Sequence, residues 1–333
     1  MQAVPFQPSS HQISEMRLPT LQELRERNPP TVHPDTAWIW GPEDEVGRLN
    51  LLTDPRIKET ASKEITTGTV VSLNWDIHLP EFPAFGRPPC QTRLLPNASS
   101  DLVFDDTLSM NTQSGSQWDG FRHFGHMTKN VFYNGLLRAD VLVGERCGIH
   151  AIANHGIVGR GVLLDYYRYA YETGKVYDPF SSHAISLQEL LACAEFQGTE
   201  LQIGDILLIR SGYTARYYEL KHTDPRRLKE AGCLEPQFVG VEQSEEMKTW
   251  LHDSYFAAVA GDAPAFEVWP PKKDYHMHEY LLALWGMIVG EMFDLESLSE
   301  ICNKRRKHTF FFTSAPINHR GGVASLANAL AIL

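Results

Sequence analysis

Short apolar runs bounded by glycine and polar residues are the feature that most constrains the fold of this chain. The clearest run occupies residues 204–212, and related runs occur at 161–165 and 256–260. Runs of this length and composition are typical of strands that are buried on both faces of a sheet. Between them, one helical pattern occupies residues 187–196, with Ser186 as a plausible N-cap, and a second occupies residues 244–253. Interleaved strands and helices predict an α/β fold.

Two further segments resemble strands. Residues 102–107 lead into a glycine-rich stretch, and Val141-Leu142-Val143 has the apolar character of a buried strand. No repeat of 20–50 residues is present, and no GxGxxG motif follows a predicted strand. We therefore expect no nucleotide cofactor.

The first 35 residues differ in character from the rest. They contain six prolines and little apolar periodicity, apart from a short helical pattern at 21–27. We interpret 1–35 as an extended N-terminal arm and 36–333 as the folded domain. Extended arms of this kind are disordered or lie across a partner subunit, so a homodimer or homotetramer is expected.

Composition excludes several classes of partner. The net charge is −11, with 41 acidic against 30 basic residues, which argues against binding to nucleic acid or to an anionic membrane. No apolar stretch is long enough to span a bilayer, and the first residues lack a signal-peptide pattern. Five widely separated cysteines without a CxxC pair suggest free thiols in a reducing compartment. We expect a soluble cytoplasmic protein.

Candidate chemistry concentrates in residues 110–126. This stretch places Asp119, His123 and His126 together with the amides of Gln113 and Gln117, among glycines that permit tight turns. Such a segment suits a loop at the end of a strand, where polar side chains can converge. If Asp119 caps a helical turn, Asp119 and His123 face the same side.

The same stretch resembles the signature of the cyclase family, which includes kynurenine formamidase and isatin hydrolase. Gly115, Ser116, Asp119 and His123 align with the signature, but Gln113 and Gln117 stand where family members carry two histidines. Weaker resemblance in the same order extends over residues 36–333. It implies a single cyclase-like α/β domain of the swivelling β/β/α type.

The resemblance also implies a metal site. Carried over to this chain, the ligands are Asp119, His278 and Glu291, and His123 is the acid–base catalyst; His276 competes with His278. Because amides are weaker zinc ligands than imidazoles, three alternatives remain open. One divalent ion, Mn²⁺ or Zn²⁺, binds the three ligands; an oxygen-preferring ion also uses the amides; or no metal binds, and His123 and Glu291 transfer protons alone.

Aromatic residues predict a pocket for a flat, small-molecule substrate. Trp40, Trp118 and Phe121, together with the amides of Gln113 and Gln117, are the predicted substrate-binding residues. The predicted function is hydrolysis of an amide, lactam or lactone by a metal-bound water. The alternatives are a metal-free lyase or isomerase, and a binding protein without activity.

Overall fold

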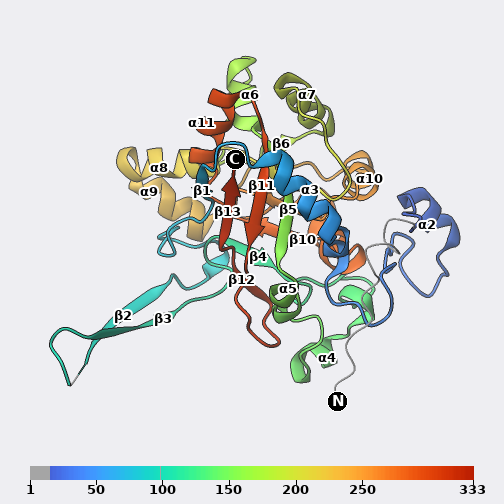
Figure 1. Ribbon diagram of the computed structural model, residues 1–333, viewed down its shortest axis with the longest axis horizontal. Coiled ribbons are helices and arrows are strands. Elements are labelled where there is room, and N and C mark those ends of the chain that lie inside the picture. Colours follow the sequence, from blue (N-terminus) through green and yellow to red (C-terminus); the bar gives the residue numbers. More distant parts are fainter. Residues whose placement is uncertain (1–15, 98) are drawn as a thin grey trace.

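A nine-stranded mixed sheet forms the centre of the molecule in a computed structural model that describes residues 16–97 and 99–333 (Figure 1). The strand order is β1-β13-β11-β5-β7-β9-β10-β4-β12. The strands are β1 (Val70–Ser72), β4 (Gln117–Asp119), β5 (Ile157–Leu164), β7 (Ile206–Ile209), β9 (Ala258–Gly261), β10 (Ile288–Glu291), β11 (Thr309–Ser314), β12 (Ala324–Leu326) and β13 (Ala329–Ile332). The predicted α/β class is confirmed.

The middle of this sheet is parallel. Strands β5, β7, β9 and β10 run in the same direction, and antiparallel pairs extend the sheet on both sides. Every residue of β7, β9 and β10 is buried, as expected for parallel strands that are covered on both faces. The predicted strand at 204–212 is therefore confirmed at the centre of the sheet.

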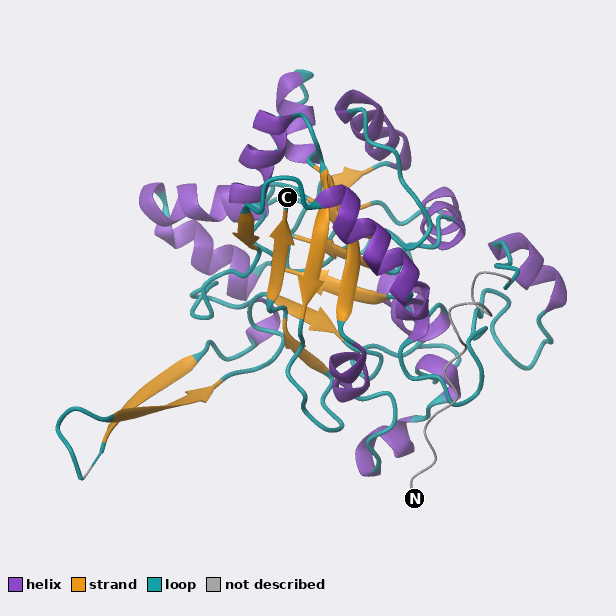
Figure 2. Cartoon of the chain, viewed as in Figure 1, coloured by secondary structure: helices purple, strands orange, loops and turns teal. Residues whose placement is uncertain are grey.

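Helices surround the sheet (Figure 2). The α-helices are α2 (Leu21–Arg27), α3 (Asp54–Glu64), α4 (Arg138–Val143), α5 (Ile149–His155), α6 (Tyr166–Glu172), α7 (Leu187–Gln197), α8 (Tyr213–Thr223), α9 (Pro225–Lys229), α10 (Glu245–Asp253) and α11 (Glu296–Arg305). The side chains of Ser186 and Ser244 accept hydrogen bonds from backbone N–H groups in the first turns of α7 and α10. The helices predicted at 187–196 and 244–253 are thus confirmed, and Ser186 caps the first of them as expected.

The expectation of a buried strand at Val141–Val143 is wrong, because these residues end helix α4. Asp140 accepts a hydrogen bond from the backbone N–H of Leu137 and so closes the first turn of that helix. None of the six residues of α4 is buried. The apolar character of this segment therefore does not reflect a place in the core.

The predicted arm lies partly outside the described residues, at 1–15. The remainder includes the predicted helix α2, which packs Leu21 and Leu24 against the body. The backbone N–H of Leu21 donates to Asp253 on α10, and Arg25 pairs with Asp35 and with Glu245 on α10. Residues from Leu21 onward thus contact the domain of their own chain.

A long hairpin projects from the body (Figure 1). It is formed by β2 (Gln91–Pro96) and β3 (Phe104–Ser109), which pair in antiparallel register from Gln91↔Ser109 to Pro96↔Phe104. A second small sheet pairs β6 (Ala184–Ile185) with β8 (Gly240–Val241). Among the described helices, none has both the length and the apolar composition that a membrane crossing requires.

One buried histidine predicts a dependence of stability on pH. Burial lowers the pKa of His252 on α10 to about 4, and its Nε2 has no hydrogen-bond partner among the described residues. In the unfolded chain this histidine binds a proton near its usual pKa, so acidification favours unfolding. Between pH 6.5 and 4 the free energy of unfolding should fall by roughly 3 kcal/mol through this residue alone.

Denaturant unfolding of the wild type and of a His252→Gln variant at both ends of this range measures that contribution. The acid-induced loss should be smaller in the variant, whereas the same substitution at the exposed His222 should leave the loss unchanged. Equal losses in wild type and His252→Gln would contradict the assignment.

Candidate active site

Two neighbouring strands bring the early and late acidic residues together. Strand β4 pairs with β10 in antiparallel register, and Glu291 lies opposite Gln117 while Val289 lies opposite Asp119. Because side chains alternate along a strand, Gln117 and Asp119 point to the same face of the sheet as Glu291. Residues that are 172 positions apart thus meet on one face through strand pairing.

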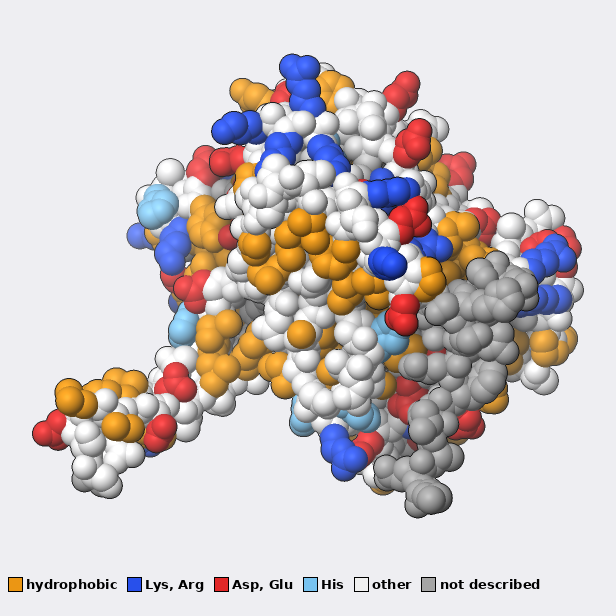
Figure 3. All heavy atoms as spheres, in the orientation of Figure 1, with side chains coloured by type: hydrophobic (Ala, Val, Ile, Leu, Met, Phe, Trp, Pro, Cys, Tyr) orange, Lys and Arg blue, Asp and Glu red, His pale blue; other side chains and the backbone are white. Residues whose placement is uncertain are grey.

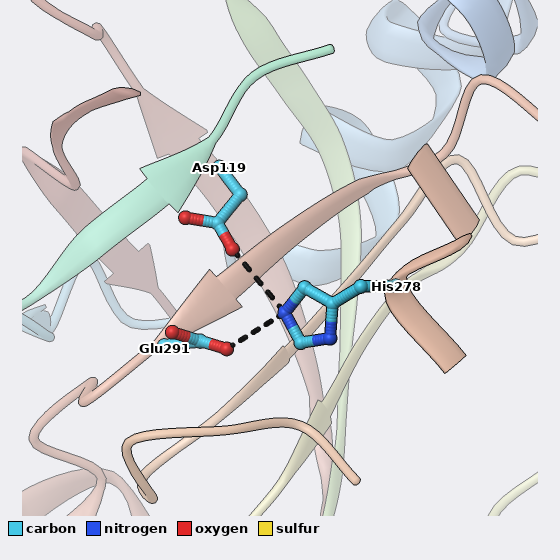
Figure 4. A group of neighbouring side chains, drawn as sticks. All are labelled: Asp119, His278 and Glu291. Atoms are coloured by element: carbon cyan, nitrogen blue, oxygen red, sulfur yellow. Dashed lines mark hydrogen bonds and ion pairs between the residues drawn. The ribbon is translucent and has the colours of Figure 1, made fainter. Parts of the chain in front are cut away.

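His278 completes the group from a third element (Figure 4). It immediately precedes the helical turn η5 (Glu279–Leu284). Its Nε2 lies 3.0 Å from Glu291 Oε1 and 3.4 Å from Asp119 Oδ2, and its Nδ1 lies 2.7 Å from Glu267 Oε2. An ionised Glu267 can only accept a hydrogen bond, so Nδ1 carries the proton between them and Nε2 faces Glu291 and Asp119.

The side-chain amides of the two glutamines form hydrogen bonds with the carboxylates of the site. Gln113 Nε2 donates to Asp119 Oδ1 at 2.6 Å, and Gln117 Nε2 donates to Glu291 Oε2 at 2.7 Å. Gln117 Nε2 also lies 2.7 Å from Gln113 Oε1, so the two amides are linked to each other. They therefore hold the orientation of both acids.

Burial and neighbouring charges shift the pKa values of the members of this buried group in different directions. Burial opposes ionisation of Asp119, but His123 and His278 outweigh it and lower its pKa. Burial and the neighbouring Asp119 raise the pKa of Glu291 to about 7. Burial also disfavours the charged form of His278, but the charge of Glu267 and the other acids raises its pKa well above the usual value. Three acidic side chains thus surround one imidazole ring, and Glu291 is the acid among them whose pKa lies near neutral pH.

A cavity of about 180 Å³ opens onto this group. Arg87, His123, Glu267, His278 and Glu291 contribute polar atoms, and the remaining walls are largely aromatic: Phe85, Phe124, Trp269 and His276, with Pro264 and Ala265. Larger surface hollows elsewhere, such as one of about 510 Å³ along α10, contain none of these residues. We therefore place the site at the smaller cavity.

His123 lies at the edge of this cavity and is partly exposed. Its Nε2 is 3.9 Å from Asp119 Oδ2. Asp119 is not the cap of a helical turn, as the sequence suggested, because it is the last residue of β4. The chain turns at Gly120, where His123 N–H donates to the Gly120 carbonyl, and this turn returns the imidazole toward the acid. Burial lowers the pKa of His123, so the ring is neutral near pH 7.

The structure does not bring Trp40, Trp118 and Phe121 to the cavity. All three are buried in the core. Trp118 packs edge-on against Phe293 and Phe312 and donates its indole N–H to Ser314. The strand alternation that points Gln117 and Asp119 toward the site points Trp118 to the opposite face.

His276, which competes with His278 in the sequence, has a different position. It lines the cavity wall, where its ring stacks on Trp269 with centroids 5.8 Å apart. Sequence reasoning did not identify Phe85 and Arg87 as cavity residues. Both precede the hairpin in a proline-rich stretch with no periodic pattern, so no local signal marks them.

The residues present suit a divalent cation. One ligand atom each from Asp119, His278 and Glu291 lies within 4.8 Å of the others. Asp119 Oδ2 is buried and forms no hydrogen bond with a described residue, and the same holds for Gln117 Oε1. Glu267 holds the second nitrogen of His278, as carboxylates commonly do for metal-bound histidines. One imidazole and two carboxylates thus form a donor set that suits a divalent cation.

Comparison with known proteins identifies the fold. The family model for the cyclases matches residues 31–268. A crystal structure described as a novel cyclase superposes with a TM-score of 0.78 at 27% identity, over 90% of this chain and 99% of that chain. None of the curated proteins compared with the sequence matches it.

Two isatin hydrolases share the fold at lower identity. Isatin hydrolase A from Ralstonia solanacearum has a TM-score of 0.55 at 16% identity, covering 79% of this chain and 91% of that chain. The enzyme from Labrenzia aggregata, bound to benzyl benzoate, has a TM-score of 0.54 at 14% identity, covering 79% and 93%. The cyclase-like fold expected from the sequence is confirmed by these superpositions.

Proposed function

This chain belongs to the cyclase family, and from that premise we propose that it is a hydrolase of a small cyclic or aromatic metabolite. The bond cleaved is an amide, lactam or lactone. The observation that carries the proposal is the meeting of Asp119, His278 and Glu291 beside an aromatic cavity that His278 and Glu291 line. Structural similarity to two proteins described as isatin hydrolases supports the reaction class.

Asp119, His278 and Glu291 would hold one divalent ion in this proposal. Such an ion supplies a bound water of lowered pKa and polarises the scissile carbonyl. The chain itself orients the ligands. Glu267 accepts the Nδ1–H of His278 and so directs Nε2 toward the two acids. The amides of Gln113 and Gln117 donate hydrogen bonds to the two carboxylates and fix their orientation.

His123 is the proposed acid–base residue. It is neutral near pH 7 because burial lowers its pKa, and a neutral imidazole can accept a proton. Its place at the cavity edge, 3.9 Å from Asp119 Oδ2, allows it to reach a substrate bound beside the acids. It would pass that proton to the departing nitrogen or oxygen.

The cavity walls support a flat substrate. Phe124 and Trp269 supply ring surfaces, and the rings of Phe85 and Trp269 meet edge to face with centroids 5.0 Å apart. A planar ring fits between such walls at low entropic cost because the side chains are already packed. Arg87 contributes a positive charge to the cavity wall.

Metal analysis combined with a substrate panel tests the proposed function. Protein purified without chelator should contain about one ion per chain, and isatin, other lactams and lactones should be hydrolysed by the loaded protein but not after chelation. A metal content far below one per chain, or activity that survives complete metal removal, would exclude metal-assisted hydrolysis.

A metal-free lyase or isomerase is the second candidate. The observation that favours it is Glu291, whose pKa is raised to about 7 by burial and by the charge of Asp119, so that it can exchange protons near neutral pH. In that case turnover of an eliminable or isomerisable substrate would persist in metal-free protein. The metal analysis therefore separates the two candidates.

Replacing Glu267 with glutamine should weaken the site without unfolding the protein. The amide keeps the size of the side chain but removes the charge that fixes the ring of His278, so metal affinity and kcat/KM should each fall by about 10- to 100-fold. Competition with a fluorescent chelator measures the affinity. The exposed Glu246→Gln serves as the matched control, and equal affinities of the two variants would contradict the role of Glu267.

A further inference from the structure

Arg87 brings a permanent positive charge to the wall of the active-site cavity. It follows the short turn η2 (Ala84–Gly86) and lines the cavity together with His123, His278 and Glu291. Its charge acts on groups in the cavity. Burial is the main cause of the lowered pKa of His123, and the nearby charge of Arg87 lowers that pKa further. A ligand bound in the cavity would therefore experience the same charge.

The guanidinium of Arg87 is held in place without being neutralised. Its Nη1 donates to the Gln113 carbonyl at 2.9 Å, and the group lies over the ring of Phe85, 4.9 Å from the ring centroid. No carboxylate of the described residues forms an ion pair with it, whereas Arg160 and Arg210 each pair with carboxylates of the protein. Because a guanidinium has five N–H donors, most of them are left for a ligand.

Charges of opposite sign occupy different parts of the cavity wall. Glu267, His278 and Glu291 form the acidic part, where the proposed reaction takes place, and Arg87 forms the basic part. An uncharged carbonyl suits the acidic part, where an anion would be repelled in the absence of a metal. An anionic group suits the basic part. A ligand that satisfies both parts thus carries a carbonyl at one point and a negative charge at another.

The size and shape of the cavity limit the rest of the ligand. Its volume of about 180 Å³ lies below the roughly 300–1,000 Å³ of sites for drug-sized ligands. The rings of Phe85, Phe124 and Trp269 form much of the wall. A single flat ring therefore suits this space. A carboxylate on such a ring is itself planar and can accept two parallel hydrogen bonds from a guanidinium.

The charge of the whole protein does not favour an anionic ligand. The net charge is −11, and Figure 3 shows basic and acidic side chains interspersed on the face that it draws. The summed field of an acidic protein repels anions at a distance. Recognition of an anion therefore requires a positive charge inside the cavity, which Arg87 supplies.

We propose that Arg87 binds a carboxylate of the substrate and is the specificity-determining residue of this site. The substrate is then a small, single-ring amide, lactam or lactone that carries a carboxylate. The bond that is cleaved rests on the proposed function, whereas the carboxylate site rests on the surroundings of Arg87.

Isothermal titration calorimetry with benzoate and nitrobenzene tests the proposal. The two probes have the same shape, only benzoate carries a charge, and neither can be hydrolysed. Protein as purified should bind benzoate at least about 10-fold more tightly than nitrobenzene, and Arg87→Gln should remove this preference while leaving nitrobenzene binding unchanged. Arg93→Gln, in the exposed part of strand β2, is the matched control and should keep the preference.

Repeating the titrations after chelation separates Arg87 from a bound ion. The preference should persist, and a preference that disappears with the metal would assign the carboxylate to the ion and overturn the proposal. Equal binding of both probes by the wild type would also overturn it, as would a preference that survives Arg87→Gln. Equal weakening of both probes in Arg87→Gln would reduce Arg87 to a support for Gln113 and would likewise refute the carboxylate site.

These outcomes are distinguishable from failure of the proposed function. A protein that hydrolyses neutral lactams without preferring benzoate refutes the carboxylate site alone. A protein that prefers benzoate through Arg87 but holds no metal and hydrolyses nothing refutes the proposed hydrolysis alone.

Discussion

Asp119→Asn should lower the turnover of the loaded enzyme by at least about a thousandfold and remove most of the bound metal. The variant keeps the shape of the side chain and its contact with Gln113, but it removes a negative charge that lies 3.4 Å from His278 Nε2. Losing a charged ligand costs several kcal/mol of transition-state stabilisation, and each 1.36 kcal/mol is a tenfold loss of rate.

Unfolding measurements separate this loss from a structural defect. Asp119 is fully buried, and because the neighbouring histidines lower its pKa the folded protein favours the ionised carboxylate, so the free energy of unfolding should also fall in the variant. Metal content and turnover are therefore compared at a temperature at which unfolding curves show both proteins to be folded. The exposed Asp274→Asn, which lies near His278 in sequence, should keep full metal content and turnover. Metal content and activity near wild type in Asp119→Asn would remove Asp119 from the ligand set.

Gly240→Ala should destabilise the fold by at least about 3 kcal/mol and also impair the site. Strand β8 passes directly against the backbone of Glu267: an added Cβ would lie 2.3 Å from its carbonyl carbon and 2.5 Å from its carbonyl oxygen. Backbone atoms cannot rotate away as a flexible side chain can. Relief therefore requires movement of Glu267, which holds the ring of His278.

Gly261→Ala provides the matched control for this prediction. It also adds a methyl group to a buried strand, but the nearest atom, the Ile209 carbonyl oxygen, would be 3.6 Å away, an ordinary contact. Thermal and denaturant unfolding should place this variant close to the wild type. If both alanine variants are equally stable, the close approach of β8 to Glu267 is not what keeps residue 240 a glycine.

Local sequence signals predicted the parts of the fold that local physics determines. The helices α7 and α10 begin where Ser186 and Ser244 can cap them, and β7 is a buried strand because its residues are uniformly apolar. The segment Val141–Val143 misled the prediction. Three apolar residues are too few to distinguish a strand from a helix, and their exposure depends on what lies beside them in space.

In the site, too, some features follow from local sequence signals and others depend on contacts between distant segments. The grouping of Asp119 with His278 and Glu291 followed from resemblance, and strand pairing explains it. The position of Trp118 could have been predicted from the sequence, because side chains alternate along β4 and Trp118 therefore points away from Asp119. By contrast, Glu267 binds His278 only because β8 and the segment around residue 267 meet, as the bridge between Val241 and Glu267 shows. No local pattern encodes that contact.

Gln113 and Gln117 lie on the inner side of the acidic group. Their side-chain amides donate to Asp119 and Glu291 and contact each other, a role that neutral groups can fill without adding charge. These hydrogen bonds restrict the carboxylates to one orientation. We therefore expect the two amides to act as positioning residues for the acids, and not as contacts to the substrate.

The strand order has a consequence for the course of folding. Strand β1 joins the sheet through β13, with Val70 opposite Ile332, and β4 lies between β10 and β12, with Asp119 opposite Val289 and Ala324. Both early strands therefore pair with segments that come far later in the chain. Contacts between distant segments form slowly, because closing the intervening loop costs entropy before the pairing is gained, so the strands that carry the site should be among the last parts of the sheet to form.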